Sequence, residues 1–413
     1  MSTRKVIIHG HFYQPPRENP WTGDIERQPS ASPYPNWNHR ITDECYRPNC
    51  HAAILDDTAH IVQRRLTYSR VSFDFGPTLL RWLEQHAQDV YACVLEADRR
   101  SISRWGHGNA VAQPYHHSIL PLCSPEDRRL EVRLGIQDFE RRFNRKPEGM
   151  WLPETAVDLP TLQCLAEEGI QFVILAPHQA AVDDVDTTVA HKVEGVDIAA
   201  FFYDGALARG VAFDGLLHDG AAFASALKEA SAKGLANLAT DGESYGHHHR
   251  HGEMALAWCI NALQEDPEVD LTNYAAFLAE FGTAKTTPIV EKSAWSCPHE
   301  LGRWSWGCPC GHADNGDPSW RPELRAALEW LRDAIGPCEG ELLTQRLAMF
   351  TSCGWFFDDP GGLEPVQNLR HAARAIQLAG RPELERGLLA RLPNLDEVWD
   401  EQVRPLVSCS PRR

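Results

Sequence analysis

The chain has 413 residues, of which 43% are hydrophobic, so it can bury a large core. Its formal net charge at pH 7 is −17, and its surface should therefore repel nucleic acids and anionic lipids. A neutral or weakly polar substrate such as a sugar fits this charge better than a polyanion. The segment before His9 is too short for the core of a signal peptide, and no run of about 18 apolar residues follows. We therefore expect a cytoplasmic protein that binds neither nucleic acid nor membrane.

The first predicted element is a buried strand over residues 5–8, an apolar run that ends before a Pro-Pro pair. Residues 13–51 follow, rich in Pro, Asn, Arg and Trp and without a clear period. A long irregular segment inside a compact enzyme is usually functional. Residues 71–73 predict the next strand, and Pro77 begins a helix.

Strands and helices then alternate along the chain. Strands are expected at 149–152, 172–176 and 236–239, and helices after the N-cap Asp158 and over about 222–233. This alternation indicates an α/β protein with a parallel sheet, either open or closed into a barrel. The polar clusters follow the carboxyl ends of the strands, which is where a barrel has its active site.

The pattern becomes helical from about Tyr274 onward. Residues 321–336 and 368–389 carry apolar positions at a spacing of three to four. We expect a catalytic barrel domain over residues 1–285. A mainly helical region over residues 286–413 should pack on the barrel and can complete its active site.

The stretch LATDGESYGHHHRHGE, from Leu238 to Glu253, is the richest in reactive side chains. Its apolar start predicts the end of a buried strand, and Asp241 and Glu243 follow directly. Four histidines come next, at positions 247, 248, 249 and 251. Carboxylates and imidazoles at a strand end have little structural purpose, so this stretch is a candidate active site.

A second carboxylate, Glu154, also follows a predicted strand and lies close to Trp151 in the sequence. Cleavage of a glycosidic bond needs two carboxyl groups that flank the bond, and aromatic faces pack on sugar rings. Glu154 and Asp241 are far apart in the sequence, so only the fold can bring them together. The local pattern leaves a second interpretation open, in which Glu154 is a helix-entry acid and Asp241 a turn residue.

His9 and His11 are two positions apart in the first strand, so their side chains point to the same face. At the mouth of a barrel they can bind hydroxyl groups or help to hold a metal. His9 can also be a hydrogen-bonded histidine of the core.

Several motifs occur in one order: HGHFYQPPRENPW, His117 to Leu122, PEGMWLPETAVD, ATDGESYGHHHRHGEMALA and TSCGWFFDD. Together they resemble glycoside hydrolase family 57, in the branch that carries domain of unknown function 3536. The resemblance implies an incomplete (β/α)7 barrel and a retaining mechanism on α-linked glucans without a metal or another cofactor. Glu154 matches the position of the nucleophile and Asp241 that of the general acid/base. The expected substrate-binding residues are His9, His11, Gln14, Glu44, His117, Trp151, Glu243, Tyr245, His248 and Trp304.

Cysteine usage is expected to be that of a reduced protein, with single core thiols such as Cys93, Cys123, Cys164 and Cys259. One exception is the segment from Cys297 to His312, which also contains His299, Cys308 and Cys310. Structural zinc prefers a Cys-x2–4-Cys spacing, which this segment lacks. We therefore expect packed reduced thiols there rather than a metal site.

Two other functions remain open on the sequence alone. One is a metal-dependent deacetylase-like enzyme acting on carbohydrate, with Asp241 and the histidines after it as ligands. The other is a non-catalytic glucan-binding protein that descends from an enzyme.

Overall fold

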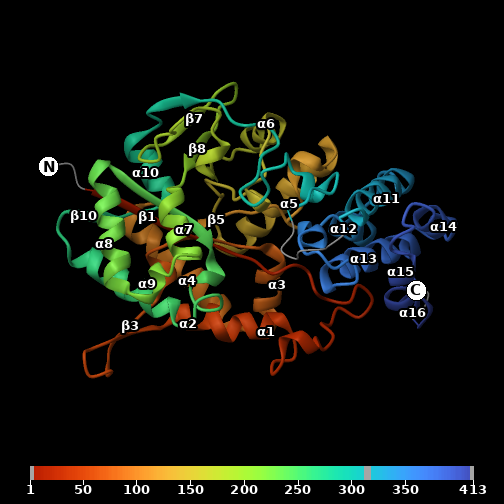
Figure 1. Ribbon diagram of the computed structural model, residues 1–413, viewed down its shortest axis with the longest axis horizontal. Coiled ribbons are helices and arrows are strands. Elements are labelled where there is room, and N and C mark those ends of the chain that lie inside the picture. The colour runs from red at the N-terminus through yellow and green to blue at the C-terminus, as the bar shows by residue number, and fades with distance from the viewer. Residues whose placement is uncertain (1–3, 311–317, 410–413) are drawn as a thin grey trace.

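The computed structural model describes residues 4–310 and 318–409. A strand-containing body occupies one end of the molecule, and helices of the C-terminal region occupy the other (Figure 1). The strands are β1 Arg4–Phe12, β2 Ala52–Leu55, β3 Ile61–Arg65, β4 Ser72–Phe75, β5 Ala110–Val111, β6 Phe172–Leu175, β7 His191–Val193, β8 Ala199–Phe202, β9 Leu235–Asp241, β10 Val269–Leu271 and β11 Lys285–Thr287.

Helices follow or connect most of these strands. Those of the first body are α1 Trp37–Ile41, α2 Arg47–Cys50, α3 Pro77–His86, α4 Gln88–Trp105, α5 Pro125–Phe143, α6 Leu159–Glu167, α7 Gly205–Ala212, α8 Gly220–Ala230, α9 Gly252–Glu265 and α10 Tyr274–Phe281. Those of the C-terminal region are α11 Trp320–Ile335, α12 Gly340–Ala348, α13 Leu363–Ala379, α14 Glu383–Leu389, α15 Asp396–Gln402 and α16 Arg404–Cys409.

The parallel strands form an incomplete barrel, and β1 is the strand with the most neighbours in its sheet. β1 pairs with β9 on one side and with β4 and β10 on the other, and β4 pairs with β5. Parallel bridges from Ala112 to Met150 and from Gly149 to Phe172 lead on to β6, which pairs with β8. β8 and β9 meet where the Asp204 amide donates to the Asn237 carbonyl at 2.7 Å. This is the (β/α)7 type of fold that the sequence predicts.

The predicted elements are largely confirmed, with local differences. Residues 149–152 form bridge pairs rather than a regular strand, because Pro153 turns the chain into a short 3-10 helix. Asp158 caps α6 as expected by accepting from the Thr161 amide. The pattern over 368–389 belongs to two helices, because Gly380 takes φ 64° and ends α13 before Pro382.

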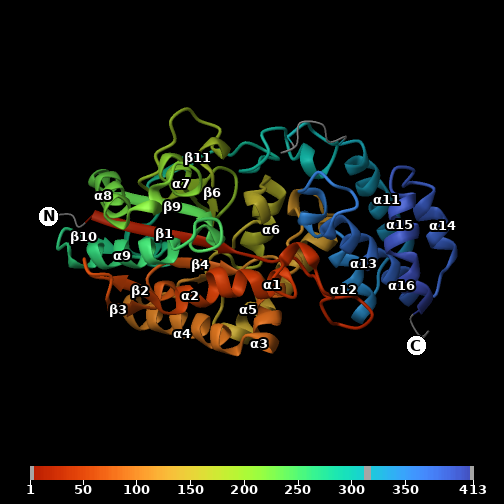
Figure 2. The same cartoon turned by 60° about the horizontal axis from the view of Figure 1, so that its bottom comes forward.

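The candidate site residues lie at the carboxyl end of β1, which faces the C-terminal region. β1 runs from the N-terminal end of the molecule toward the helices α11 to α16 (Figure 2). Its central residues Val6, Ile7 and Ile8 are buried, which fixes the strand inside the barrel. The predicted boundary at residue 285 falls at the start of β11, which pairs with β7, and the division into two domains stays a prediction.

One expectation about the cysteines is wrong. Cys50 and Cys93 form a disulfide that joins α2 to α4, so Cys93 is not a reduced core thiol. Their Cα atoms lie 6.0 Å apart, within the usual range for a disulfide. The pairing depends on how two helices pack, and the sequence does not show that.

Among the residues that the structure describes, no helix is long and apolar enough to cross a membrane.

Candidate active site

The carboxyl ends of three adjacent strands bring the central polar residues together. In the β1–β9 pairing His11 lies opposite Asp241, and in the β1–β4 pairing it lies opposite Asp74. Residues paired across neighbouring strands share one face of the sheet. His11 therefore stands between two carboxylates that come from distant parts of the chain.

Asp74 is fully buried and organises this group of side chains. Its Oδ1 lies 3.0 Å from His9 Nε2, and its Oδ2 lies 2.8 Å from His11 Nδ1. The Gln113 side-chain amide donates to the same Oδ2 at 2.9 Å. A buried carboxylate needs such donors, and here they fix both histidine rings. The sequence interpretation missed Asp74, which lies one residue before the end of β4.

His9 and His11 have opposite protonation tendencies. Burial lowers the pKa of His9, whose Nδ1 also lies 3.0 Å from the Ser72 hydroxyl. Burial acts in the same direction on the pKa of His11. There, however, the charge and hydrogen bond of Asp74, with the charges of Asp241 and Glu243, raise the pKa to about 9. These shifts favour the cationic form of His11 and the neutral form of His9, which is fully buried.

Glu154 is held in a strained turn. Its φ is 57°, a left-handed value that is uncommon outside glycine and often marks a functional residue. The Trp295 indole donates to Glu154 Oε2 at 3.1 Å, and the Ser296 hydroxyl donates to the same oxygen at 2.6 Å. Oε1 accepts no hydrogen bond from the described residues. The carboxylate is thus oriented through one oxygen while the other is available.

Asp241 lies at the exposed end of β9. Surrounding protein atoms nevertheless desolvate its charged form and raise its pKa to about 6. The His11 cation lowers this pKa, while the charges of Glu154 and Asp74 raise it. Glu154 and Asp241 are therefore close enough to interact through space.

Glu243 lies beneath the surface next to Asp241. Its Oε1 accepts from the Tyr46 hydroxyl at 2.5 Å and from the Tyr13 amide at 3.2 Å. Burial raises the pKa of Glu243 to about 7, although the bond from Tyr46 acts against this rise. Glu243 links the N-terminal segment to the end of β9.

His117 connects the barrel to the C-terminal region. Its backbone has φ 58°, and its Nδ1 lies 2.6 Å from the hydroxyl of Ser352. The ring stacks on Tyr13 with centroids 3.8 Å apart and on His11 at 5.3 Å. Its buried Nε2 has no hydrogen-bond partner among the described residues. Desolvation lowers the pKa of His117 well below its usual value, so this nitrogen belongs to a neutral ring.

Three residues expected to contact sugar are buried instead. Trp151 is fully buried and stacks on His9 and His11, with centroids 5.0 and 4.9 Å away. Tyr245 packs in the core between β9 and α9, and Trp304 packs in the C-terminal core with its indole bonded to the Ser352 carbonyl. These aromatic faces contact protein in this structure, and their role as sugar contacts stays a prediction.

The remaining candidates lie at the periphery. Glu44 accepts from the Arg40 guanidinium at 3.1 Å and lies 2.5 Å from His247 Nδ1. His248 is exposed, and the Gln14 side-chain oxygen accepts from Arg17 at 3.2 Å. Among the described residues, none of these side chains bonds directly to Asp241 or Glu154.

The histidines after Asp241 do not gather around it. His247 pairs with Glu44, and His249 Nε2 lies 3.1 Å from the carbonyl of Ala212. Within residues 4–310 and 318–409, the one set of three or more side chains placed like metal ligands comprises Cys297, His299, Cys308 and Cys310. The ligand set expected for a deacetylase-like site at Asp241 is therefore not assembled.

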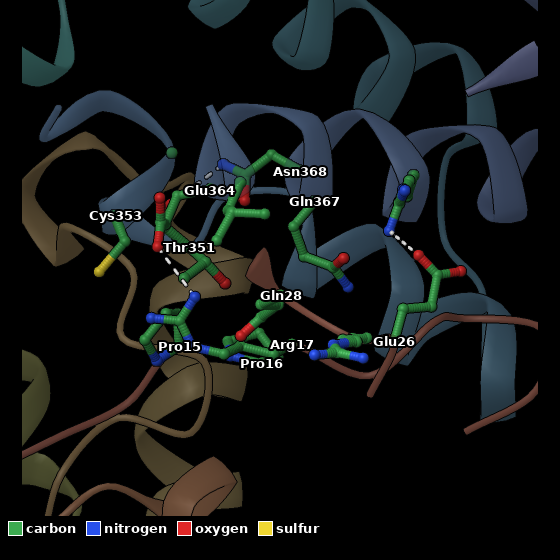
Figure 3. A pocket seen from close by; sticks show the side chains of 14 residues that line it. Pro15, Pro16, Arg17, Glu26, Gln28, Thr351, Cys353, Glu364, Gln367 and Asn368 are labelled. Carbon is green, nitrogen blue, oxygen red and sulfur yellow. Dashed lines mark hydrogen bonds and ion pairs between the residues drawn. The ribbon is translucent and has the colours of Figure 1, made fainter. Parts of the chain in front are cut away.

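A pocket lies between the N-terminal segment and the C-terminal region (Figure 3). Arg17 crosses it to pair with Glu364 at 3.0 Å, and Glu26 pairs with Arg370 at 3.2 Å. Two wall residues of the pocket, Pro15 and Cys353, closely follow Tyr13 and Ser352 in the sequence, and both of these contact His117. Its lining comprises Pro15, Pro16, Arg17, Glu26, Arg27, Gln28, Thr351, Cys353, Gly354, Leu363, Glu364, Gln367, Asn368 and Arg370.

A His11→Gln substitution should raise the pKa of Asp241 above about 6, because it removes the cation that lowers this pKa. Carbon-detected NMR titration of the Asp241 carboxyl would measure the change. His248→Gln is the matched control, since His248 is not among the groups that act on Asp241. An unchanged or lower pKa in His11→Gln would contradict the assigned charge of His11.

Comparison with known proteins places these features in a family. The model of glycosyl hydrolase family 57 matches residues 33–290, and that of domain of unknown function 3536 matches residues 340–395. A 4-alpha-glucanotransferase of Thermococcus litoralis is 23% identical over 244 residues, which is 55% of this chain and 36% of that protein. An alpha-amylase of Pyrococcus horikoshii is 24% identical, over 55% of this chain and 37% of that protein. These matches thus span little more than a third of the relatives' length.

Solved structures show the same fold over nearly the whole chain. The crystal structure of a family 57 branching enzyme from Pyrococcus horikoshii superposes with a TM-score of 0.67 at 16% identity. The match covers 100% of this chain and 98% of the other. The fold therefore extends through the C-terminal helices.

Proposed function

Because the chain belongs to glycosyl hydrolase family 57, we propose that it cleaves or transfers α-glycosidic bonds in α-glucans with retention of configuration. The nucleophile is Glu154 and the general acid/base is Asp241. The observation that carries this proposal is the contrast between the two carboxyl groups. One is fixed by Trp295 and Ser296, and the other has a pKa raised to about 6.

In the first step Glu154 Oε1 attacks the anomeric carbon, and Asp241 protonates the leaving oxygen. A retaining glycosidase needs one ionised and one protonated carboxyl group at the start of this step. Ser296 and Trp295 hold the nucleophile in place through Oε2, which reduces the entropy cost of reaching the transition state. The raised pKa of Asp241 keeps a useful fraction of it protonated near pH 6.

The second step needs Asp241 as a base, and the charges favour this change of role. Formation of the glycosyl ester neutralises Glu154, whose charge is one of those that raise the pKa of Asp241. The pKa of Asp241 therefore falls in the intermediate. The Asp241 carboxylate then accepts a proton from water or from a sugar hydroxyl, which gives hydrolysis or transfer respectively.

Sugar binding falls to the polar groups around these carboxylates. The buried, unpartnered Nε2 of His117 is suited to a sugar hydroxyl, and His11 supplies a positive charge beside Asp241. The pocket in Figure 3 is a second place for sugar units, because its wall residues Pro15 and Cys353 closely follow Tyr13 and Ser352, which contact His117. The proposed sugar contacts are His11, Gln14, Glu44, His117, Glu243 and His248.

A panel of α-glucans tests the proposal. Wild-type protein should release reducing ends or form transfer products, and proton NMR of the first product should show the α-anomer. Activity lost on chelation and restored by added metal on acetylated glycans would favour the deacetylase-like alternative. Glucan binding without turnover of any member of the panel would favour the non-catalytic one.

A further inference from the structure

Three cysteines and one histidine converge in the loop that follows Ser296. The ligand atoms of Cys297, His299, Cys308 and Cys310 all lie within 4.8 Å of one another. Cys297 Sγ is 3.6 Å from Cys308 Sγ and 3.5 Å from Cys310 Sγ. A disulfide needs about 2.05 Å, so these sulfurs are free thiols in contact. The buried Nδ1 of His299 has no hydrogen-bond partner among the described residues.

We propose that these four side chains bind one zinc ion. Three cysteines and one histidine are a common structural zinc set, with Zn–S distances of about 2.3 Å. A tetrahedron with such bonds has sulfurs about 3.8 Å apart, close to the observed separations. In a 4Fe–4S cluster each thiolate binds a different iron, so sulfurs in mutual contact fit a single ion better.

The loop is folded so that two short arms meet. Cys297-Pro-His299 forms one arm and Cys308-Pro-Cys310 the other. The turn between them is tight, because a Cβ atom on Gly302 would come within 2.8 Å of the Cys308 Cβ. The Gly302 amide donates to the His299 carbonyl at 2.7 Å. The unusual Cys-x-Cys spacing in the sequence argues against zinc. In the structure, however, Cys297 and His299 of the first arm lie beside Cys308 and Cys310 of the other. His312, which closes the Cys-rich segment in the sequence, lies outside the described residues.

The proposed zinc site adjoins the support of Glu154. Ser296 and Trp295 directly precede Cys297, and both bond to Glu154 Oε2. Arg303, within the same loop, donates to the Ser296 carbonyl at 3.3 Å. The ion would thus anchor the segment that positions the nucleophile. This positioning role rests on the proposed function, whereas zinc binding does not.

Metal analysis of the full chain, purified under reducing conditions from zinc-supplemented medium, tests the site. We expect about one zinc per chain in wild type and below about 0.1 in Cys308→Ser, Cys310→Ser and His299→Ala. His299→Cys should keep the zinc, because it preserves a four-ligand set. Cys338→Ser is the matched control, since Cys338 is a free, partly exposed cysteine outside the cluster. Circular dichroism would confirm that each variant folds, and cobalt substitution should give the visible bands of a tetrahedral thiolate site.

Several results would overturn the site. They are wild-type protein with less than about 0.1 zinc, Cys310→Ser with full zinc, another metal at stoichiometry, or a disulfide among these cysteines. If the ion helps to position Glu154, loss of zinc should lower kcat at least about 10-fold with little change in KM. Unchanged kcat in zinc-free, folded protein would contradict only the claim that the ion positions Glu154, and not the metal site itself. Zinc at stoichiometry in a protein inactive on every glucan would instead contradict the proposed function and leave the metal site intact.

Discussion

Glu154→Gln is expected to reduce kcat on α-glucans by about 10⁴-fold, because an amide cannot form the glycosyl-enzyme. The amide retains the shape of the carboxylate and can still accept from Trp295 and Ser296, so substrate affinity should change little. Single-turnover assays with wild type and variant would measure the effect. Glu167→Gln is the matched control, because Glu167 makes only exposed contacts, an ion pair with Arg129 and a hydrogen bond from Gln163.

A smaller side chain at the same position gives a second test. In Glu154→Ala, added azide should restore part of the turnover and yield a glycosyl azide of inverted configuration, because the anion enters the space that the carboxylate vacates. More than about a tenth of wild-type activity in Glu154→Gln, without any contaminating enzyme, would show that another residue is the nucleophile.

Asp241→Asn is expected to lower turnover of α-glucans by about 10³-fold, since general acid/base catalysis usually contributes 10²–10⁴-fold. Attack on a glycosyl fluoride needs little proton transfer, so its first step should fall far less. In wild type the acid must be protonated, and its pKa is about 6. The rate should therefore decline as pH rises above about 6, and this decline should be absent in Asp241→Asn.

Rate profiles from pH 4 to 9 on both substrates would measure these effects. Asp183→Asn, at an exposed position of a surface loop, is the control. An equal loss on glucan and glycosyl fluoride, or a retained decline near pH 6, would assign the acid to another residue, and Glu243 would be examined first.

Much of the candidate site is predictable because its carboxylates follow apolar runs whose pattern is local. Glu154 and Asp241 both follow such runs, and the register of β1 with β9 then places Asp241 beside His11. Asp74 could not be singled out, because its role arises only when two histidines of a neighbouring strand meet it.

Other parts of the site depend on packing that the sequence does not encode locally. Trp151 beside Glu154 suggests a sugar platform, and in the structure the stacked rings of His9 and His11 cover its face. The spacing of the cysteines alone favours packed thiols in the loop after Ser296. The sequence does not show that the fold brings His299 to Cys308 and Cys310 across the turn at Gly302.

The link between Ser352 and His117 has a consequence for how this protein can be divided or recombined. The Ser352 amide donates to the His117 carbonyl at 3.1 Å, and its hydroxyl meets the ring of the same histidine. His117 in turn stacks on Tyr13 and His11. A change in the orientation of the C-terminal helices would therefore be passed from Ser352 to His117 and on to Tyr13 and His11. Chimeras that exchange the C-terminal helices would need to keep Ser352 and both of its hydrogen bonds with His117.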